Sequence, residues 1–158
     1  HGQLQVAMGL ETADEQILAR LNKQMTVSDY DRACDFLIEH DISIRTFLLL
    51  PAPGVAGEDV VSHTVSSVRH ALARGSHVTS LIPLRTGNGA LDWLLEQHLV
   101  HLPDQHLAAK TFRAALDLPR SKEQRVFLDL WNFDSLAKDD ATASSLHDQM
   151  ERLNLRQA

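Results

Sequence analysis

Strand-like and helix-like segments alternate along this chain, and that alternation limits the fold more than any other feature. Apolar runs typical of strands lie at residues 4–10, 42–50, 77–82 and 124–131. Apolar stripes of helical period predict helices at residues 13–22, 26–39, 58–74, 90–98, 104–117 and 140–155. Strands joined by helical crossovers form a parallel sheet, and their connections are right-handed. The sequence therefore predicts an α/β fold in the order β-α-α-β-α-β-α-α-β-α.

The second strand-like run indicates how the sheet is covered. Its last four residues, Phe47-Leu48-Leu49-Leu50, are all apolar, which is typical of a strand in a parallel sheet covered on both faces. Four strands make either a small open sheet or half of a barrel. The 158 residues are about enough for one domain with a buried core.

Composition excludes several classes of protein. The net charge of −6 offers no electrostatic footprint for nucleic acid or an anionic membrane, although a larger parent protein could still bind RNA through a basic surface elsewhere. No apolar run approaches the roughly 20 residues of a membrane span, and the first residues have no signal-peptide character. We expect a cytoplasmic protein with no membrane partner. The single cysteine, Cys34, excludes an internal disulfide or an all-cysteine metal site made by this chain alone.

Three charged residues are candidates for a binding site. Glu11 follows the first predicted strand, at the end where parallel sheets bind ligands, and its carboxylate could accept hydrogen bonds from a diol or an ammonium group. The alternative is a helix-capping or surface role. Lys23 lies twelve residues later and by itself is typical of a solvated surface lysine. Arg45 lies within an apolar strand and must be paired or bound, unless it faces water at the strand end.

Two other groups of residues suggest weaker hypotheses. His98, His101 and His106 could hold a metal ion in a small α/β hydrolase, but their spacing matches no zinc motif, and surface or capping roles are the simpler interpretation. The segment Gly87-Asn88-Gly89 precedes a predicted helix whose N-terminus could hold an anion, and a plain turn is the simpler interpretation.

Several segments together resemble the second half of a radical S-adenosylmethionine (SAM) enzyme. The most specific are Gly9-Leu10-Glu11-Thr12 and Leu21-Asn22-Lys23-Gln24-Met25-Thr26, supported by residues 42–51, 78–83, 87–89 and 125–131. The likeness is closest to uncharacterised radical SAM proteins related to archaeosine-type tRNA modification enzymes. It implies half of a partial (β/α)6 barrel of the TIM type, in which residues 1–100 are barrel and residues 101–158 are a helical and strand extension of the same domain.

The resemblance also implies roles for the three candidates. Glu11, on the fourth barrel strand, would contact the ribose or methionine part of SAM. Lys23 would bind the SAM carboxylate, and Arg45 would project inward from the fifth strand toward SAM. We therefore expect Glu11, Lys23 and Arg45 to meet at one rim of the sheet. RNA would be a substrate of the parent protein by resemblance only, because the charge of this chain gives it no support.

The three-cysteine motif that binds the [4Fe-4S] cluster of this family is missing from the chain, as are the first three barrel strands. We therefore expect SAM and the cluster in a parent protein, and neither in this chain alone, which as an isolated fragment should be inactive. Its expected partner is the N-terminal half of the barrel. The exposed sheet edge would otherwise pair with a second copy in a homodimer, or be covered by the C-terminal helices. The alternative function is a non-enzymatic interaction module, a degenerate half-barrel that has lost its chemistry.

Overall fold

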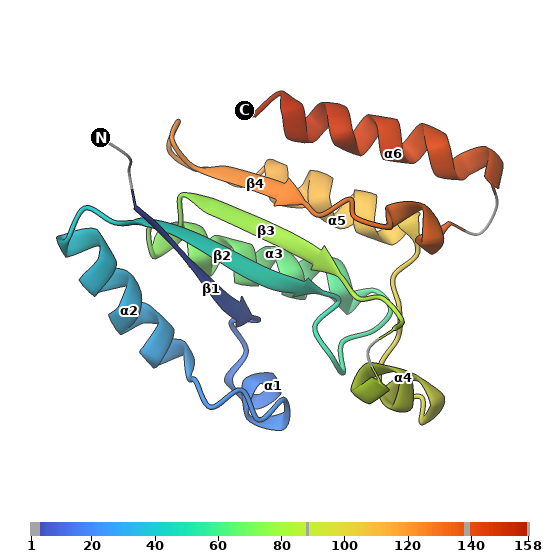
Figure 1. The fold of residues 1–158 in the computed structure, drawn as a ribbon, viewed down its shortest axis with the longest axis horizontal. Coiled ribbons are helices and arrows are strands. Elements are labelled where there is room, and N and C mark those ends of the chain that lie inside the picture. Colours follow the sequence, from blue (N-terminus) through green and yellow to red (C-terminus); the bar gives the residue numbers. More distant parts are fainter. Residues whose placement is uncertain (1–3, 88, 138–139, 158) are drawn as a thin grey trace.

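A four-stranded parallel sheet forms the centre of the protein (Figure 1). The computed structural model describes residues 4–87, 89–137 and 140–157. The strands lie side by side in chain order: β1 (Gln5–Glu11), β2 (Ser43–Leu50), β3 (Val78–Pro83) and β4 (Arg125–Leu128). The α/β fold class and the four predicted strands are confirmed, and neighbouring strands in chain order are the arrangement that right-handed crossovers produce in a barrel.

Helices fill the connections where the apolar stripes predict them. They are α1 (Glu15–Arg20), α2 (Val27–Glu39), α3 (Asp59–Ala73), α4 (Gly89–Glu96), α5 (Gln105–Leu116) and α6 (Asp140–Leu155). A short 3-10 helix at Phe133–Leu136, which the sequence analysis does not predict, connects β4 to α6. None of the helices in the described part of the chain is both long and apolar enough to cross a bilayer.

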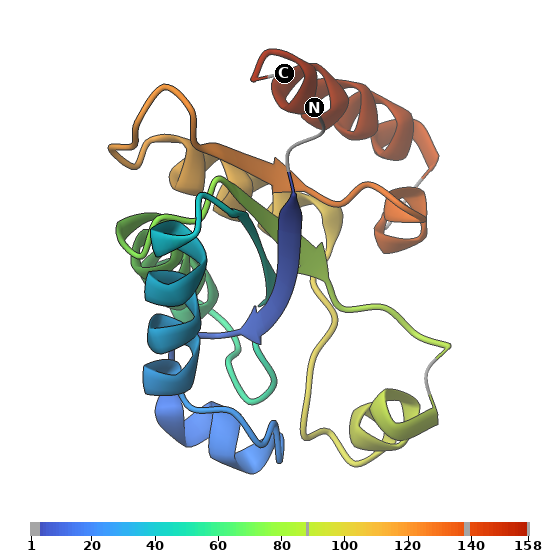
Figure 2. The same cartoon turned by 60° about the vertical axis from the view of Figure 1, so that its left-hand side comes forward.

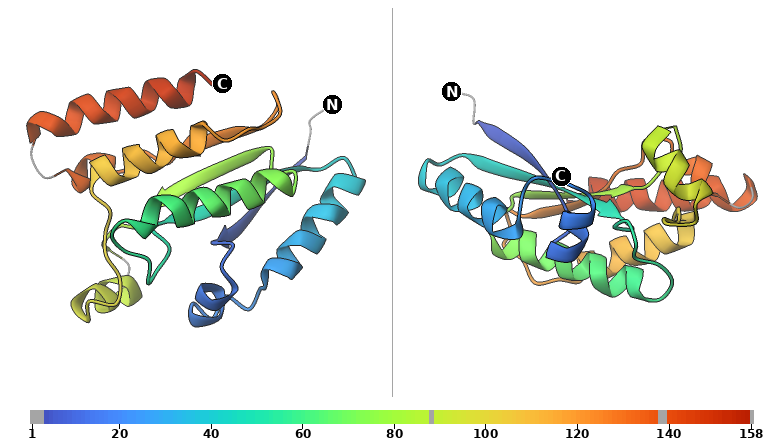
Figure 3. Two further views of the ribbon diagram at one scale, coloured as in Figure 1. Left: turned by 180° about the vertical axis from the view of Figure 1, so that it is seen from behind. Right: turned by 90° about the horizontal axis from the view of Figure 1, so that it is seen from below.

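The helices cover one face of the sheet and leave the other open (Figure 3). Along β2, Ile44, Thr46, Leu48 and Leu50 are buried against the layer that contains α2 and α3, whereas Arg45, Phe47 and Leu49 on the opposite face are only partly buried. In a complete barrel this second face would line the interior. The prediction of a strand covered on both faces is therefore wrong for this chain by itself, because its second face has no covering layer among the described residues.

A buried chain of hydroxyl groups crosses the helix-covered side of the sheet. The Tyr30 hydroxyl lies 2.7 Å from Thr46 Oγ1, which donates to Ser76 Oγ at 2.9 Å. Burial raises the pKa of the Tyr30 hydroxyl and that of the neighbouring Cys34 thiol, so both stay neutral inside the core. On α2, the residues Tyr30, Cys34 and Leu37 are buried in the core, whereas Phe36 is largely exposed.

The C-terminal helix α6 covers the outer edge of β4 (Figure 2). The Asn154 side chain accepts from Leu128 N at 3.1 Å and donates to Leu128 O at 2.8 Å. The Gln157 side chain does the same at Val126, with distances of 3.1 and 2.6 Å. Two side-chain amides thus take the place of a fifth strand at the β4 edge.

Candidate functional site

The carboxyl ends of the strands form a rim, and Glu11 and Lys23 meet there. Lys23 Nζ donates to Glu11 Oε1 at 2.6 Å, and the two side chains are 29% and 21% exposed. Figure 1 shows β1 ending at this rim, with α1 and the following loop beside it. The predicted pairing of these two residues is confirmed. One carboxylate oxygen and two ammonium hydrogens of the pair remain for a ligand.

Gly9 provides the space in which the pair forms. A Cβ atom at this position would lie 2.7 Å from Glu11 Oε1 and 3.1 Å from Lys23 Nζ. The strand register shifts between Gly9 and Glu11, and Glu11 has a positive φ of 65°. A bulge of this kind re-aims a side chain, and a non-glycine residue in this conformation costs on the order of 1–2 kcal/mol. The bulge directs Glu11 over Gly9 toward Lys23.

Hydrogen bonds from α3 fix the turn that follows Glu11. Thr12 is fully buried, and its hydroxyl lies 3.3 Å from Ser67 Oγ, which also accepts from Ala13 N at 3.0 Å. Asp14 then caps α1 by accepting from Gln16 N and Ile17 N at 2.9 and 3.1 Å. Although burial opposes it, these hydrogen bonds lower the pKa of Asp14, which remains charged. The turn is therefore held in one conformation.

A second set of hydrogen bonds positions the loop that contains Lys23. Glu15 accepts from Val27 N at 2.9 Å and so ties the start of α2 to α1. Thr26 and Asp29 form a capping box at the start of α2, and the hydrogen bonds from Thr26 lower the pKa of Asp29. Lys23 lies between two residues with positive φ, Asn22 and Gln24. The tight loop presents the lysine to β1 from the end of α1.

Arg45 does not join this pair. It is paired with Ala7 in the sheet, whereas Glu11 is paired with Leu48, about 10 Å further along β2 at roughly 3.3 Å per residue. Arg45 Nε donates to Gln5 Oε1 at 3.0 Å, near the amino end of the sheet. The Arg45 side chain lies on the helix-free face, which would line the interior of a complete barrel, so its inward direction agrees with the prediction. The prediction that it reaches the rim is wrong. The guanidinium is held by a neighbouring strand instead.

The rim carries a second polar cluster that the sequence analysis missed. Arg85 follows β3 and Asp129 follows β4, and Arg85 Nη2 donates to Asp129 Oδ2 at 2.9 Å. Trp131 is 73% exposed and lies over the guanidinium, 5.2 Å from ring centroid to Arg85 Cζ. Arg85 Nε is buried and has no hydrogen-bond partner among the residues that the structure describes. A positional signal existed for Arg85, which comes shortly after the predicted strand at residues 77–82. Asp129 lies within the predicted strand at residues 124–131, and only the structure shows that β4 ends at Leu128.

The structure gives little support to the two weaker hypotheses, which concern the three histidines and the glycine turn. Within residues 4–87, 89–137 and 140–157, no group of three or more His, Cys, Asp or Glu is placed to hold a metal ion, and His98, His101 and His106 are all exposed. Asn88 of the predicted turn lies outside the described residues. The neighbouring Gly87 N donates to Asp92 Oδ1 at 3.0 Å. This amide therefore already has a hydrogen-bond acceptor from α4 and is not available to an anion.

Comparison with known proteins shows the fold of the chain and leaves its family open. No family model matches the sequence, and no curated protein matches it. Among solved structures, it is similar to the archaeal Elp3 of Methanocaldococcus infernus with an N-terminal deletion (1–46), with a TM-score of 0.71 and 14% identity over 94% of this chain and 36% of that one. It is also similar to the HMG-CoA lyase from Brucella melitensis, with a TM-score of 0.52 and 12% identity over 93% of this chain and 45% of that one.

These likenesses support part of the expected architecture. The chain spans less than half the length of either neighbour. Both neighbours have folds of the TIM-barrel type, and the chain has the fold of a portion of such a barrel. At 14% and 12% identity, nothing about chemistry follows from the likeness itself.

Proposed function

We propose that this chain is the SAM-binding portion of a radical SAM barrel and that Glu11 and Lys23 bind the amino-acid end of SAM. The observation that carries the proposal is the hydrogen-bonded pair, 2.6 Å apart and partly exposed, at the ligand-binding rim of a parallel sheet. The fold likeness supports the barrel part of this proposal, and the sequence resemblance supports the SAM-binding part.

The charges of the pair suit a zwitterion. Glu11 keeps one carboxylate oxygen that can accept from the α-ammonium group of SAM, and Lys23 keeps two N–H donors for its carboxylate. Because Gly9 has no side chain, the pair can lie directly over the β1 backbone. Hydrogen bonds fix both the turn after Glu11 and the loop that contains Lys23, so the two charged groups are in place before a ligand binds. This reduces the conformational entropy that binding costs.

The chain does not supply ligands for an iron–sulfur cluster. Cys34 is its only cysteine, and it is fully buried in α2 on the helix-covered side. A [4Fe-4S] cluster does not fit these residues, so any cluster must be bound by another polypeptide segment. We propose that this segment is the N-terminal half of the barrel and that it packs against β1 and the helix-free face. Parallel pairing with β1 would extend the sheet toward a closed barrel.

The test is SAM binding by the complete gene product, reconstituted anaerobically with iron and sulfide. Glu11→Gln and Lys23→Met should each weaken SAM binding by about tenfold or more, because each removes a charge-assisted hydrogen bond. Arg45→Gln is the matched control and should leave the affinity within about twofold, since Arg45 lies away from the rim. Equilibrium dialysis with labelled SAM measures all four proteins.

Two outcomes would contradict the proposal. If Glu11→Gln and Lys23→Met bind SAM as well as Arg45→Gln does, the assignment of the pair is wrong. If the complete product binds neither SAM nor a cluster, the chain is better explained as a non-enzymatic half-barrel that interacts through its open face. Circular dichroism of each variant would separate loss of binding from loss of fold.

A further inference from the structure

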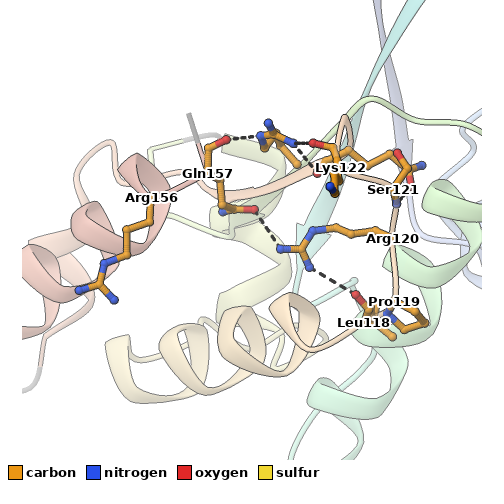
Figure 4. Close-up of a pocket in the computed structure, with 9 residues that line it drawn as sticks. Leu118, Pro119, Arg120, Ser121, Lys122, Arg156 and Gln157 are labelled. Atoms are coloured by element: carbon orange, nitrogen blue, oxygen red, sulfur yellow. Dashed lines mark hydrogen bonds between the residues drawn. The ribbon is translucent and has the colours of Figure 1, made fainter.

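A basic cavity lies at the end of the sheet opposite the Glu11–Lys23 rim. It has a volume of about 580 Å³ and lies where the C-terminal ends of α5 and α6 meet the segment leading into β4 (Figure 4). Its walls come from residues 118–122, 124–125 and 156–157. This volume is within the range of small-molecule sites. The cavity is therefore large enough for a ligand and separate from the proposed SAM site.

The charge of this cavity has one sign. Arg120, Lys122, Arg125 and Arg156 line it, and its lining includes no acidic residue. Within the described chain, none of these four cations has a carboxylate within 4 Å, although the whole protein has a net charge of −6. Glu123, which lies between Lys122 and Gln124 in the sequence, lines a neighbouring cavity instead, together with Ile38 and His77. Four cations without acidic partners concentrate positive potential in a concave site.

Two of the guanidinium groups are fixed by the backbone. Arg120 donates to Leu116 O and Leu118 O, and Arg125 donates to Gln157 O and Lys122 O. Gln157 is itself held by its amide hydrogen bonds to the edge of β4. Nε of Arg120 and Nη2 of Arg125 have no hydrogen-bond partner among the described residues. These arginines are held rigidly while retaining N–H donors for a ligand.

The other two cations are exposed to solvent. Lys122 and Arg156 are exposed, and no hydrogen bond from either side chain is found within the described residues. Figure 4 shows Lys122 on the segment before β4 and Arg156 on the turn after α6, with the Arg156 side chain directed away from Arg120 and Lys122. A rigid base of two guanidinium groups flanked by two free cations is suited to an anion with several charges, because one phosphate would leave most of this charge unneutralised.

We propose that this cavity binds a compact ligand with several phosphate groups, such as a nucleoside polyphosphate. Arg120 and Arg125 would contact the phosphates from the base, and Lys122 and Arg156 would close over them. The four cations come from two short segments, residues 120–125 and Arg156, and so compact a cluster suits grouped phosphates better than the extended backbone of a nucleic acid.

Calorimetric titration of the chain with inorganic tripolyphosphate tests the proposal. The double variant Lys122→Gln/Arg156→Gln should weaken binding by about tenfold or more at 0.15 M salt, because two charges at the site are lost. Neither side chain forms an internal hydrogen bond, so the fold should be unaffected. The matched control is Arg20→Gln/Arg69→Gln, which removes the same charge from exposed positions on α1 and α3 and should bind as the wild type does.

The same titration with a single-stranded RNA oligonucleotide distinguishes the two sources of phosphate. Tighter binding of tripolyphosphate than of RNA at equal phosphate concentration supports the compact site. RNA binding without tripolyphosphate binding would overturn it, as would equal loss of affinity in the control variant. No binding of either probe to the wild type would also overturn it. None of these results bears on Glu11 and Lys23.

Discussion

Gly9 shows how one missing side chain can shape a site. Its φ is not in the left-handed region, so an alanine would suit the strand backbone, but a Cβ would lie 2.7 Å from Glu11 Oε1. The atoms in the way are the ends of two flexible side chains, which can move at little cost. The effect of a Gly9 substitution should therefore fall on the geometry of the Glu11–Lys23 pair more than on the fold.

Gly9→Ala should leave the free energy of unfolding within about 1 kcal/mol of the wild-type value while removing the coupling between Glu11 and Lys23. A double-mutant cycle with Glu11→Gln and Lys23→Met measures that coupling by urea denaturation. We expect about 0.5–1 kcal/mol with Gly9 in place and close to zero after Gly9→Ala. An unchanged coupling energy would mean that the pair adapts to the methyl group and that Gly9 has another role.

The predictability of the site differs from residue to residue. Glu11 could be placed at the rim because it ends a predicted strand. Lys23 could be placed beside it only through the family resemblance, because a lysine in this context is by itself typical of a solvated surface residue. Arg45 is only the fourth residue of its predicted run, and its distance along β2 from the rim exceeds what its side chain spans. Arg85 and Asp129 lie in loops, where no periodicity marks them. Their contact depends on the pairing of β3 with β4, which is a long-range feature.

At the scale of elements, α6 has a role that its apolar stripe does not reveal. The stripe predicts a helix that packs on a core, as Leu146 and Met150 do. The amides of Asn154 and Gln157 additionally satisfy the edge of β4, and this depends on the precise axial position of the helix. Sequence periodicity gives the face of a helix but not its axial position, so the role of these two amides could not be predicted.

Removing either amide should destabilise the chain. Asn154→Ala and Gln157→Ala should each lower the free energy of unfolding by about 1–3 kcal/mol, since two backbone groups of β4 lose their partner in each case. Gln149→Ala on the same helix is the control, with an expected change below about 0.5 kcal/mol, because its contact with Arg113 is exposed. Chemical denaturation measures all three. If the two amide variants match the control, water satisfies the edge equally well.

At the scale of the whole molecule, the two edge strands of the sheet differ in whether another segment covers them. The β4 edge is covered by α6, whereas no described segment pairs with the outer edge of β1. The helix-free face beside β1 carries Phe47 and Leu49, which are only partly buried. An open edge next to an apolar face is a surface on which another strand can add. The asymmetry matches a piece of a barrel whose remaining strands lie on the β1 side.

The isolated chain should therefore associate with itself through β1 when no N-terminal half is present. Sedimentation velocity should show a shift from monomer to dimer as concentration rises. Ala7→Lys, which places a charge on the exposed edge strand, should restore the monomer, because a lysine on an edge opposes strand addition. Ala73→Lys, at an exposed position on α3, is the matched control and should dimerise as the wild type does. A monomer at all concentrations, or a dimer unaffected by Ala7→Lys, would show that β1 is not the surface that requires a partner.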